Sequence, residues 1–590
     1  MLSEKTINIS IQKNRILFHY PSTPKEEISE KFPGVQISPH STKAALAPLT
    51  NRNWNNTLKA IKELKKDSYQ VILDKSVGDW VSSQKSEAIV RSEAAQILLQ
   101  ENHVEIEGLK LPLRKWQHTA VAFLEKATST PFPSRVKLPE IQFPHSPAHD
   151  ARRSQYKGAI IADEMGLGKT FEVMGHLLHK GEKAIIVVPA SIQEDWVEKI
   201  TKLVDCKIYR VTDSFDLNRA ALSDIVVMSF GKLKKHVLTV GLLAGFQNRV
   251  VVIDEAQDIR NPGSGRNKRV QILTYFAKYT VAMTGTPVIN NPRDLYPVLL
   301  ATRRLWSPFN SFSEFNSRYS SSVNAQKEIM EKLKGVVCRR LKTSVWLDGP
   351  EKSIEEIWVP QTPRYKKLYQ EVERDFVKWL RKSSADGKMS GLKKGQALVK
   401  IGVLRQICAA SKLQIFRKIL NRAISTGEQV VVFCNYNNPL INLAEAFANA
   451  RGVSQGIEWA GCGLITGKQT VRARQQTIST FQKGKIGILF CATKAAGLGF
   501  DFTRSRLVFH LDLPWTPAAF EQASDRVHRI GQLRNCRVIK ILCRDTVDER
   551  IQEIIFAKAE HTKNVLDDED ALERVQASVI KKLVGCYINN

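Results

Sequence analysis

The stretch Gly158–Thr170 reads GAIIADEMGLGKT, a short apolar run followed by glycines, a lysine and a threonine. This pattern predicts a buried strand that turns through a glycine-rich loop into a helix. Such a turn aims several backbone N–H groups and the positive end of the helix dipole at one point, which suits the phosphates of a nucleotide. The stretch therefore predicts a phosphate-binding loop.

Within this loop, Lys169 is expected to reach the β and γ phosphates of ATP, and the Thr170 hydroxyl to hold Mg²⁺. Asp163 stands where the usual pattern has its first glycine, so the strict pattern is missed by one residue. The alternative is a plain glycine turn between a core strand and a core helix. The residues expected to contact the nucleotide are Asp163, Glu164, Met165, Gly166, Leu167, Gly168, Lys169 and Thr170.

Length and charge narrow the class of protein. A chain of 590 residues is too long for one hydrophobic core, so roughly two to four domains are expected. It carries 88 Lys and Arg against 59 Asp and Glu, a net charge of +29, which favours a polyanionic partner. The alternative is a solvated basic surface without such a partner.

The cysteines and the apolar runs exclude several other classes. Nine cysteines are scattered without a CxxC pair, which indicates neither a zinc site nor a disulfide framework. No apolar run approaches the roughly 20 residues of a membrane span, and the first residues lack a signal-peptide core. We therefore expect a soluble intracellular protein with no membrane partner.

Residues 1–104 are predicted to form a small α+β accessory domain. Ile7, Ile9 and Ile11 alternate with polar residues, which indicates a half-buried strand, and Ile16–Tyr20 could pair with it as a hairpin. Helices are expected around 58–66 and 86–100. No cluster of chemically active residues lies here, so this domain could bind a protein target, touch nucleic acid or only aid solubility.

Strands and helices alternate after the phosphate loop, which predicts a parallel sheet. Asp254 and Glu255 follow one of these strands directly, at the end where α/β sheets place their ligands. Asp254 can hold Mg²⁺ while Glu255 orients and polarises an attacking water. The strands are expected at Ala184–Val188, Ile225–Ser229, Arg249–Ile253 and Val281–Pro287.

Gln117 lies about fifty residues before the phosphate loop in a segment with helical spacing of apolar residues. Its amide offers a donor and an acceptor side by side, which could read the edge of an adenine. The alternative is a solvated glutamine on a helix surface.

At this point the motifs resemble a known family. DEMGLGKT at 163–170, DEAQ at 254–257 and TGTP at 284–287 resemble the first motor lobe of superfamily-two helicase-type ATPases, and specifically of Swi/Snf-type DNA translocases. LRQIC at 404–408, GEQVVVF at 427–433, TKAAGLG at 493–499 and QASDRVHRIGQ at 522–532 are similar to that family's later motifs. The RIGQ ending is the most specific match. Gln257, Ala496 and Asp501 depart from the histidine, glycine and asparagine that the family usually has.

The resemblance covers about residues 105–550 and implies an α/β protein with two RecA-like parallel-sheet motor lobes and helical insertions. It implies a first lobe with a helical protrusion at 105–345, a linker and helical insertion at 346–410, and a second lobe at 411–550. Residues 551–590 are expected to form a helical brace. Residues 382–396 carry Gly, Ser and Lys without apolar periodicity and are predicted to be a flexible loop.

Arg526 and Arg529 stand three residues apart, on one face of a predicted helix. In a two-lobe motor they would face Lys169 and stabilise charge that builds up on the γ phosphoryl group, as an arginine finger does. The alternative is a pair of arginines in surface salt bridges.

The resemblance implies double-stranded DNA as the partner, with translocation or remodelling as the output. A strand-separating DNA or RNA helicase and a clamp that has lost hydrolysis are the alternatives. A bacterial cytoplasm or a phage-infected cell is favoured over a nucleus, and neither the target nor the oligomeric state follows from the sequence. The expected contacts to DNA phosphates are Arg260, Asn261, Lys268, Arg269, Arg339, Arg340, Thr493 and Lys494.

Overall fold

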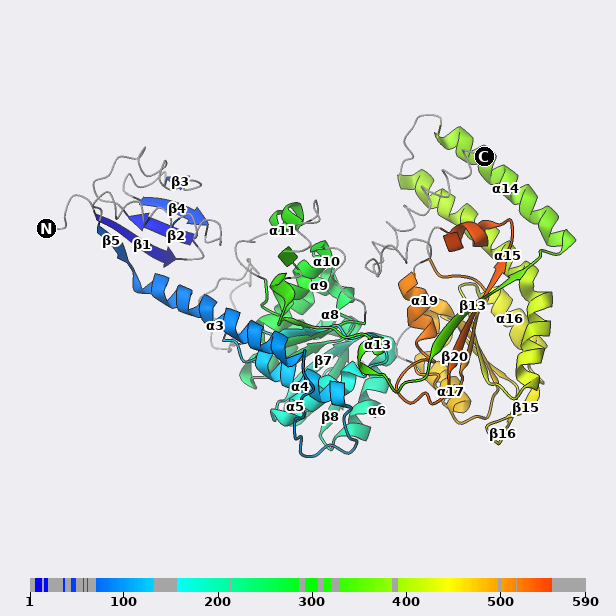
Figure 1. Cartoon of the computed structure of the whole chain (residues 1–590), viewed down its shortest axis with the longest axis horizontal. Coiled ribbons are helices and arrows are strands. Elements are labelled where there is room, and N and C mark those ends of the chain that lie inside the picture. The colour runs from blue at the N-terminus through cyan, green and yellow to red at the C-terminus, as the bar shows by residue number, and fades with distance from the viewer. Residues whose placement is uncertain are drawn as a thin grey trace.

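The structure is a computed structural model in which three sheets organise the chain (Figure 1). One sheet belongs to the N-terminal unit, and one forms the centre of each of two larger lobes. The structure describes residues 6–12, 15–19, 36–37, 44–48, 57, 61, 70–131, 156–212, 214–285, 292–305, 312–319, 328–329, 331–384, 391–496, 500–515 and 517–553.

The first lobe is built on a seven-stranded sheet in the order β12-β6-β11-β10-β7-β9-β8, with every neighbouring pair parallel. Its central strands are buried along their whole length, which is why they read as continuous runs of Val, Ile and Ala. The strands are β6 (Ala159–Ile161), β7 (Ala184–Val188), β8 (Ile208–Arg210), β9 (Ile225–Ser229), β10 (Val250–Ile253), β11 (Thr280–Met283) and β12 (Val337–Cys338). Three of the four strands predicted in this lobe are confirmed to within one residue at their ends, whereas the strand expected at 281–287 ends at Met283.

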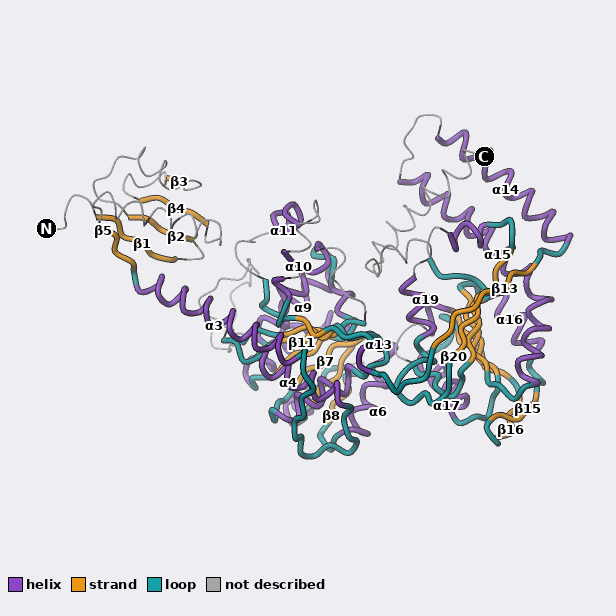
Figure 2. The backbone as a smooth tube through the Cα atoms, in the orientation of Figure 1, coloured by secondary structure: helices purple, strands orange, loops and turns teal. Residues whose placement is uncertain are grey.

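Helices cover both faces of this sheet (Figure 2). Two hydrophobic clusters, one on each face, share its strands. The helices are α4 (Lys115–Ala127), α5 (Lys169–His179), α6 (Gln193–Leu203), α7 (Leu217–Leu222), α8 (Phe230–Phe246), α9 (Gly265–Phe276), α10 (Pro292–Ala301) and α11 (Phe312–Tyr319). Residues 286 and 287, the end of the predicted strand 281–287, lie outside the described residues.

The second lobe has a six-stranded parallel sheet in the order β13-β20-β19-β14-β18-β17. A two-stranded hairpin, β15 (Arg451–Ser454) with β16 (Ile457–Ala460), stands beside it. The strands are β13 (Lys352–Val359), β14 (Val430–Cys434), β17 (Cys462–Ile465), β18 (Ile488–Ala492), β19 (Leu507–His510) and β20 (Cys536–Cys543). The helices are α16 (Asn437–Ala446), α17 (Val471–Gln482), α18 (Thr493–Ala496) and α19 (Pro517–Ser524). Both lobes therefore have the parallel α/β architecture of the RecA-like prediction.

The structure departs from the expectations for the segment between the lobes in three places. Strand β13 lies inside the predicted linker 346–410, yet it pairs with β20 along its whole length and so belongs to the second sheet. The predicted loop 382–396 is largely helical, because α14 (Pro363–Ser384) and α15 (Gly391–Ser425) leave 385–390 as the undescribed gap. The expected boundary at 410 lies within α15, whose residues Phe416 and Leu420 enter the second core.

The N-terminal unit has a five-stranded sheet in the order β3-β4-β2-β1-β5. Strands β1 (Thr6–Gln12) and β2 (Arg15–His19) form the predicted antiparallel hairpin, with Ile11 opposite Ile16. The other strands are β3 (Gln36–Ile37), β4 (Ala44–Pro48) and β5 (Gln70–Leu73). The expected helix at 58–66 lies almost wholly outside the described residues. The one at 86–100 overlaps the C-terminal half of a longer helix, α3 (Lys75–Ile97), and is confirmed as far as residue 97.

Helix α3 leads from this sheet to the first lobe, where it packs beside α4 (Figure 1). Near its C-terminal end Ala94 is buried in the first-lobe core. Glu87 pairs there with Lys157 and lies 3.6 Å from Arg304, and both basic side chains are largely buried. The helix is therefore anchored in the motor by an ionic cluster as well as by apolar packing. None of the helices in the described ranges is long and apolar enough to cross a bilayer.

Candidate active site

The phosphate loop connects β6 to α5 and depends on two glycines with a left-handed backbone. Gly166 and Gly168 have φ values of 89° and 90°, which glycine adopts without strain. A Cβ atom on Gly168 would lie 2.3 Å from the Gln117 amide nitrogen, and one on Gly166 would lie 2.8 Å from Cβ of Arg529. Side chains from α4 and from the second lobe thus approach the bare backbone of this loop.

Lys169 and Thr170 open α5, as the sequence predicts. The Lys169 ammonium donates a hydrogen bond to the carbonyl of Asp163 at 2.8 Å, so the side chain folds back over the loop. Gln117 accepts a hydrogen bond from the Arg114 N–H at 2.9 Å and donates one to the Leu167 carbonyl at 3.0 Å. Gln117 therefore braces the phosphate loop, and its contact with an adenine stays a prediction.

The Asp163 side chain does not face the nucleotide site as expected, because it is fully buried beneath the loop. It accepts hydrogen bonds from the backbone N–H of Arg340 at 2.8 Å and from the Arg340 Nε at 3.0 Å. Arg340 also donates to Glu172 at 3.1 Å. Burial, with the Asp163 carboxylate beside it, raises the pKa of Glu172 well above its usual range. Arg340 thus binds both buried acidic side chains under the loop.

Asp254 lies at the end of β10, where the sequence predicts a metal-holding carboxylate. Its Oδ2 accepts a hydrogen bond from the indole N–H of Trp196 in α6 at 2.6 Å, and its Oδ1 accepts one from the Glu255 N–H at 2.9 Å. Burial raises the pKa of Asp254 to about 7, and the neighbouring Glu255 adds to the effect. The site thus holds a buried carboxylate whose negative charge would be offset by a cation.

Glu255 adopts a left-handed backbone with φ 49°, which is uncommon for a residue with a side chain. Its Oε2 accepts a hydrogen bond from the Gln257 amide at 2.6 Å. The Gln257 oxygen in turn accepts one from the Thr284 hydroxyl at 2.9 Å. The glutamine that replaces the family's usual histidine therefore links Glu255 to the end of β11.

Arg526 and Arg529 of the second lobe meet acidic groups near the first-lobe site. Arg529 ion-pairs with Asp501, whose Oδ2 lies 4.0 Å from the Lys199 ammonium in α6. Burial alone would raise the pKa of Asp501, but the charges of Arg529, Lys199 and Arg526 together hold it below its usual range. Burial lowers the pKa of Arg526, which also feels the charge of Glu255. Arg526 thus lies within electrostatic range of Glu255, while Arg529 lies beside Gly166 of the phosphate loop.

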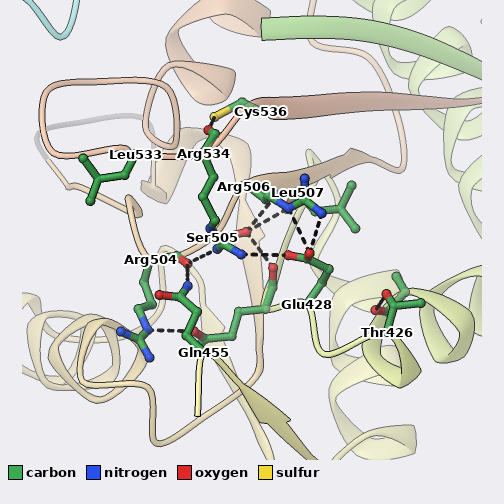
Figure 3. A network of polar contacts seen from close by, with 12 residues as sticks. Thr426, Glu428, Gln455, Arg504, Ser505, Arg506, Leu507, Leu533, Arg534 and Cys536 are labelled. Atoms are coloured by element: carbon green, nitrogen blue, oxygen red, sulfur yellow. Dashed lines mark hydrogen bonds and ion pairs between the residues drawn. The ribbon is translucent and has the colours of Figure 1, made fainter. Parts of the chain in front are cut away.

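The segment that carries these arginines is anchored at its C-terminal end. The Gln532 amide donates to the carbonyls of Ser505 and Thr503 at 2.7 and 3.0 Å. Beyond it, Arg534 donates to the Arg504 carbonyl at 3.0 Å and pairs with Glu428, which also binds Arg506 (Figure 3). This polar network fixes the chain that follows RIGQ to the start of β14.

Comparisons with protein families match residues 55–413 to the SNF2-related domain and residues 411–531 to the helicase conserved C-terminal domain. The first match alone spans more than half of the 590 residues. The chain belongs to the SNF2-related family. Its two lobes are therefore the two halves of a helicase-type ATPase core, as the motifs predict.

Curated relatives of this SNF2-related chain come from bacteria and animals. An uncharacterized ATP-dependent helicase of Mycoplasma pneumoniae is 27% identical over 458 residues, which cover 72% of this chain and 42% of that protein. The DNA annealing helicase and endonuclease ZRANB3 of Mus musculus is 26% identical over 446 residues, 71% of this chain and 40% of that protein. The chain thus spans less than half the length of these relatives. A solved structure, the SWI2/SNF2 ATPase core of Sulfolobus solfataricus in complex with dsDNA, covers 82% of this chain with 21% identity and a TM-score of 0.36.

The expected DNA contacts of this SNF2-related chain are scattered over both lobes. Arg260 and Asn261 follow the 3-10 turn Ala256–Ile259, and Lys268 and Arg269 lie on α9. Arg339 is half-buried at the end of β12, and the side chain of Lys494 lies outside the described set. Arg340 and Thr493 are corrected, because both side chains are buried. Arg340 is committed to Asp163 and Glu172, and neither side chain is presented to a nucleic acid in this conformation.

Sequence reasoning missed the partners that hold the site residues in place. The indole N–H of Trp196 carries no sequence signal of its bond to Asp254. Asp501 departs from the family's usual asparagine, but its pairing with Arg529 links residues that are 28 positions apart and so has no local sequence signal. Lys342 lies in a segment where its contacts to both lobes follow from tertiary packing alone.

Proposed function

We propose that this chain hydrolyses ATP between its two lobes and uses the cycle to move along double-stranded DNA, displacing or remodelling what is bound there. The observation that carries the hydrolytic part is the approach of the second lobe to the first, with Arg529 beside Gly166 of the phosphate loop and Arg526 within electrostatic range of Glu255. A glycine loop, a lysine, two carboxylates and facing arginines are the groups that phosphoryl transfer to water requires.

Each residue has a role that follows from its place. The backbone N–H groups of the loop and Lys169 hold the β and γ phosphates, and Gln117 keeps the loop in shape. Glu255 orients the attacking water and polarises it. Arg529, released from Asp501 by the stronger negative charge of the phosphates, stabilises the charge that develops on the γ phosphoryl group.

Thr170 and Asp254 would hold Mg²⁺, and the buried, charge-rich surroundings of Asp254 fit a divalent cation. The ion would supply neutralisation of phosphate charge. Trp196 would then fix the orientation of the Asp254 carboxylate through its bond to Oδ2.

Bound ATP attracts the arginines of the second lobe to the phosphates held by the first, so ATP binding favours closure of the lobes. Hydrolysis removes this attraction and allows the lobes to open. If each lobe grips the phosphates of DNA, this cycle moves the grip along the track. The net charge of +29 and the DNA-directed name of the ZRANB3 relative support DNA as the track. Bacterial relatives named ATP-dependent helicases keep strand separation as the second candidate function.

Hydrolysis is tested by measuring phosphate release without nucleic acid and with single strands, duplex DNA or RNA. Duplex DNA should stimulate the rate most. Lys169→Ala and Glu255→Gln should each abolish most of the activity, but Glu255→Gln should still bind nucleotide because the loop and its lysine remain. Hydrolysis by Glu255→Gln at a rate near wild type would refute the role of Glu255.

Translocation and strand separation are distinguished by two substrates. A triplex on an intact duplex reports movement without strand separation, and a forked duplex with a labelled strand reports unwinding. We expect ATP-dependent displacement of the third strand, little release from the fork, and neither with Lys169→Ala. Release from the fork without triplex displacement would replace the proposal with the helicase.

A further inference from the structure

The segment from Arg340 to Pro350, here called the connector, leaves β12 of the first lobe and leads into β13 of the second. It includes the short helix α13 (Lys342–Val345). Its first residues are bound to the phosphate loop: the Glu164 N–H donates to the Arg340 carbonyl at 3.0 Å, and the Lys342 N–H donates to Glu164 Oε2 at 2.6 Å. The main chain of the connector thus follows the phosphate loop closely.

The side chain of Lys342 reaches the other lobe. Its ammonium donates a hydrogen bond to the carbonyl of His528 at 2.7 Å and ion-pairs with Asp525 at 2.8 Å. The side chains of Lys342 and Asp525 are 6% and 4% exposed, so the pair is shielded from water. Asp525 and His528 are the immediate neighbours of Arg526 and Arg529 in the chain.

An apolar cluster reinforces this link. Trp346 of the connector stacks on the ring of His528, with 5.5 Å between centroids and 30° between planes. It packs in one cluster with Trp116 and Leu167 of the first lobe and with Ile530 of the second. The Ile530 N–H lies 3.3 Å from the Gly166 carbonyl. The connector therefore contacts the phosphate loop and the arginine-bearing segment at the same place.

We infer that Lys342 is a positioning residue that sets where Arg526 and Arg529 stand relative to the nucleotide phosphates, an inference that rests on the proposed function. Its main chain is tied to the phosphate loop, and its ammonium is tied to Asp525 and His528, the residues that directly precede the two arginines. An arginine stabilises developing charge only at the correct distance, and a misplacement of about 1 Å can cost about 100-fold in rate.

Lys352 provides a matched control because it pairs with the same carboxylate from within the second lobe. Its ammonium lies 2.9 Å from Asp525 Oδ1 and also pairs with Glu521, and its strand, β13, belongs to the second sheet. Lys342→Met and Lys352→Met each remove one of the lysines that face Asp525. Lys342→Met in addition removes the tie to the first lobe.

The test compares both variants with wild type for kcat on duplex DNA, nucleotide affinity and melting temperature. Lys342→Met should lower kcat by about 10- to 100-fold, with nucleotide affinity changed by less than about threefold, because the phosphate loop keeps its contacts. Lys352→Met should keep kcat within about threefold of wild type. An equal loss of kcat in both variants, or a loss of nucleotide binding in Lys342→Met, would overturn the inference.

A second comparison asks whether Lys342 acts through the arginine. In an Arg529→Ala background, Lys342→Met should cause little further loss of kcat, whereas independent contributions would multiply and contradict the inference. If Lys342→Met does not fold, Trp346→Leu tests the same link from the apolar side and should show the same fall in kcat at unchanged nucleotide affinity. A wild-type protein without hydrolysis, or an Arg529→Ala variant of full activity, would contradict the proposed function itself.

Discussion

At the scale of single residues, Trp196 is a test of how Asp254 is held. Its indole donates to Asp254 from within the core, where the ring is 1% exposed. Trp196→Phe keeps an aromatic ring and removes the N–H. Loss of a hydrogen-bond partner of a metal-holding carboxylate typically weakens metal affinity by about 10- to 100-fold. The Mg²⁺ concentration for half-maximal hydrolysis should therefore rise by about that factor in Trp196→Phe. Saturating Mg²⁺ should restore most of the rate.

The control for this prediction is a second buried tryptophan. Trp459 in β16 is 2% exposed, and its indole nitrogen has no hydrogen-bond partner among the described residues. Trp459→Phe makes the same change of side chain without losing a hydrogen bond, so it should leave the Mg²⁺ dependence unchanged. A lower rate in Trp196→Phe that excess Mg²⁺ does not restore would mean that the ring, and not its N–H, matters.

Asp501 supports a second prediction at this scale. It holds Arg529 in an ion pair, so the phosphates of a bound nucleotide must compete with it for that arginine. Asp501→Asn, which restores the residue usual in the resembled family, removes the competing charge. For a partly exposed pair worth about 1 kcal/mol, hydrolysis in the absence of DNA should rise by about fivefold. The measurement is steady-state phosphate release with and without duplex.

Asp205→Asn is a control for the loss of one negative charge, because the Asp205 side chain is 97% exposed and lies far along the chain from Arg529. It should leave the rate unchanged. If Asp501→Asn instead loses hydrolysis as Arg529→Ala does, the carboxylate orients the arginine for the reaction and does not compete for it.

At the scale of elements, helix α3 is the physical link between the N-terminal sheet and the motor. Glu87 pairs with Lys157 and faces Arg304, whose side chain is 1% exposed. Removing the carboxylate of this cluster leaves the buried basic side chains without a counter-ion, which destabilises the packed state of the helix by about 3 kcal/mol. Glu87→Gln should therefore increase hydrogen exchange in the C-terminal half of α3 by about 100-fold, as the helix opens locally from the first lobe.

Glu93 on the same helix is the matched control. It pairs with Lys126 of α4 at 2.6 Å, but both side chains are substantially exposed. Exposed pairs contribute at most about 1 kcal/mol, so Glu93→Gln should change exchange by less than about fivefold. Equal effects in the two variants would show that burial does not decide the strength of this anchor.

The pH dependence of the anchor has a defined sign. Burial alone would raise the pKa of Glu87, but the charges of Lys157, Arg304 and Arg91 hold that pKa below its usual range. A carboxyl group with a depressed pKa in the folded state stabilises that state above its unfolded pKa, and the contribution is lost as pH falls through the folded value. Exchange in α3 should therefore increase on acidification in wild type but much less in Glu87→Gln.

Most strands of both lobes and the presence of a helical insertion were predictable, but the extent of the insertion and the place of β13 were not. The strands β7, β9 and β14 are buried on both faces, and such burial selects short runs of Val and Ile that sequence patterns detect. The start of α15 carries lysines and glycines without apolar periodicity, so a loop was predicted where the structure continues a 35-residue helix. Strand β13 mixes charged and apolar residues. Each of its residues pairs with a residue of β20 that lies 184 positions further along the chain, so local sequence does not indicate this pairing.

For the site, the residues proposed to act on phosphates were predictable, and the side chains that support them were not. Lys169, Asp254 and Glu255 follow strand ends in a motif, so their positions relative to the sheet follow from local sequence. Arg340 shows the opposite case. The sequence Arg339-Arg340 resembles a surface contact for DNA phosphates. In the structure Arg340 turns inward, because it binds the buried acidic side chains of Asp163 and Glu172 under the loop.

At the scale of the whole molecule, the excess of basic residues makes a quantitative prediction for DNA binding. If a net charge of +29 acts through phosphate contacts, each contact releases counter-ions from the duplex. The logarithm of the association constant should then fall linearly with the logarithm of the salt concentration, by about 0.9 for each phosphate neutralised. Fluorescence anisotropy of a labelled duplex, measured over a range of salt without nucleotide, gives this slope.

Single lysines show whether the slope comes from the proposed face or from diffuse charge. Lys268 is exposed on the first turns of α9, a helix whose N-terminus follows the acidic pair, so Lys268→Ala should reduce the slope by about 1 and weaken binding to all sequences alike. Lys115 is also exposed, but its charge is offset by Glu101 at 3.2 Å, so Lys115→Ala should leave the slope unchanged. A salt response near zero would rule out an electrostatic footprint on DNA. Equal changes of the salt slope in the two variants would place the contacts elsewhere than at α9. Lys268, which has no ion pair among the described residues, would then contribute no more to the slope than Lys115, which is paired with Glu101.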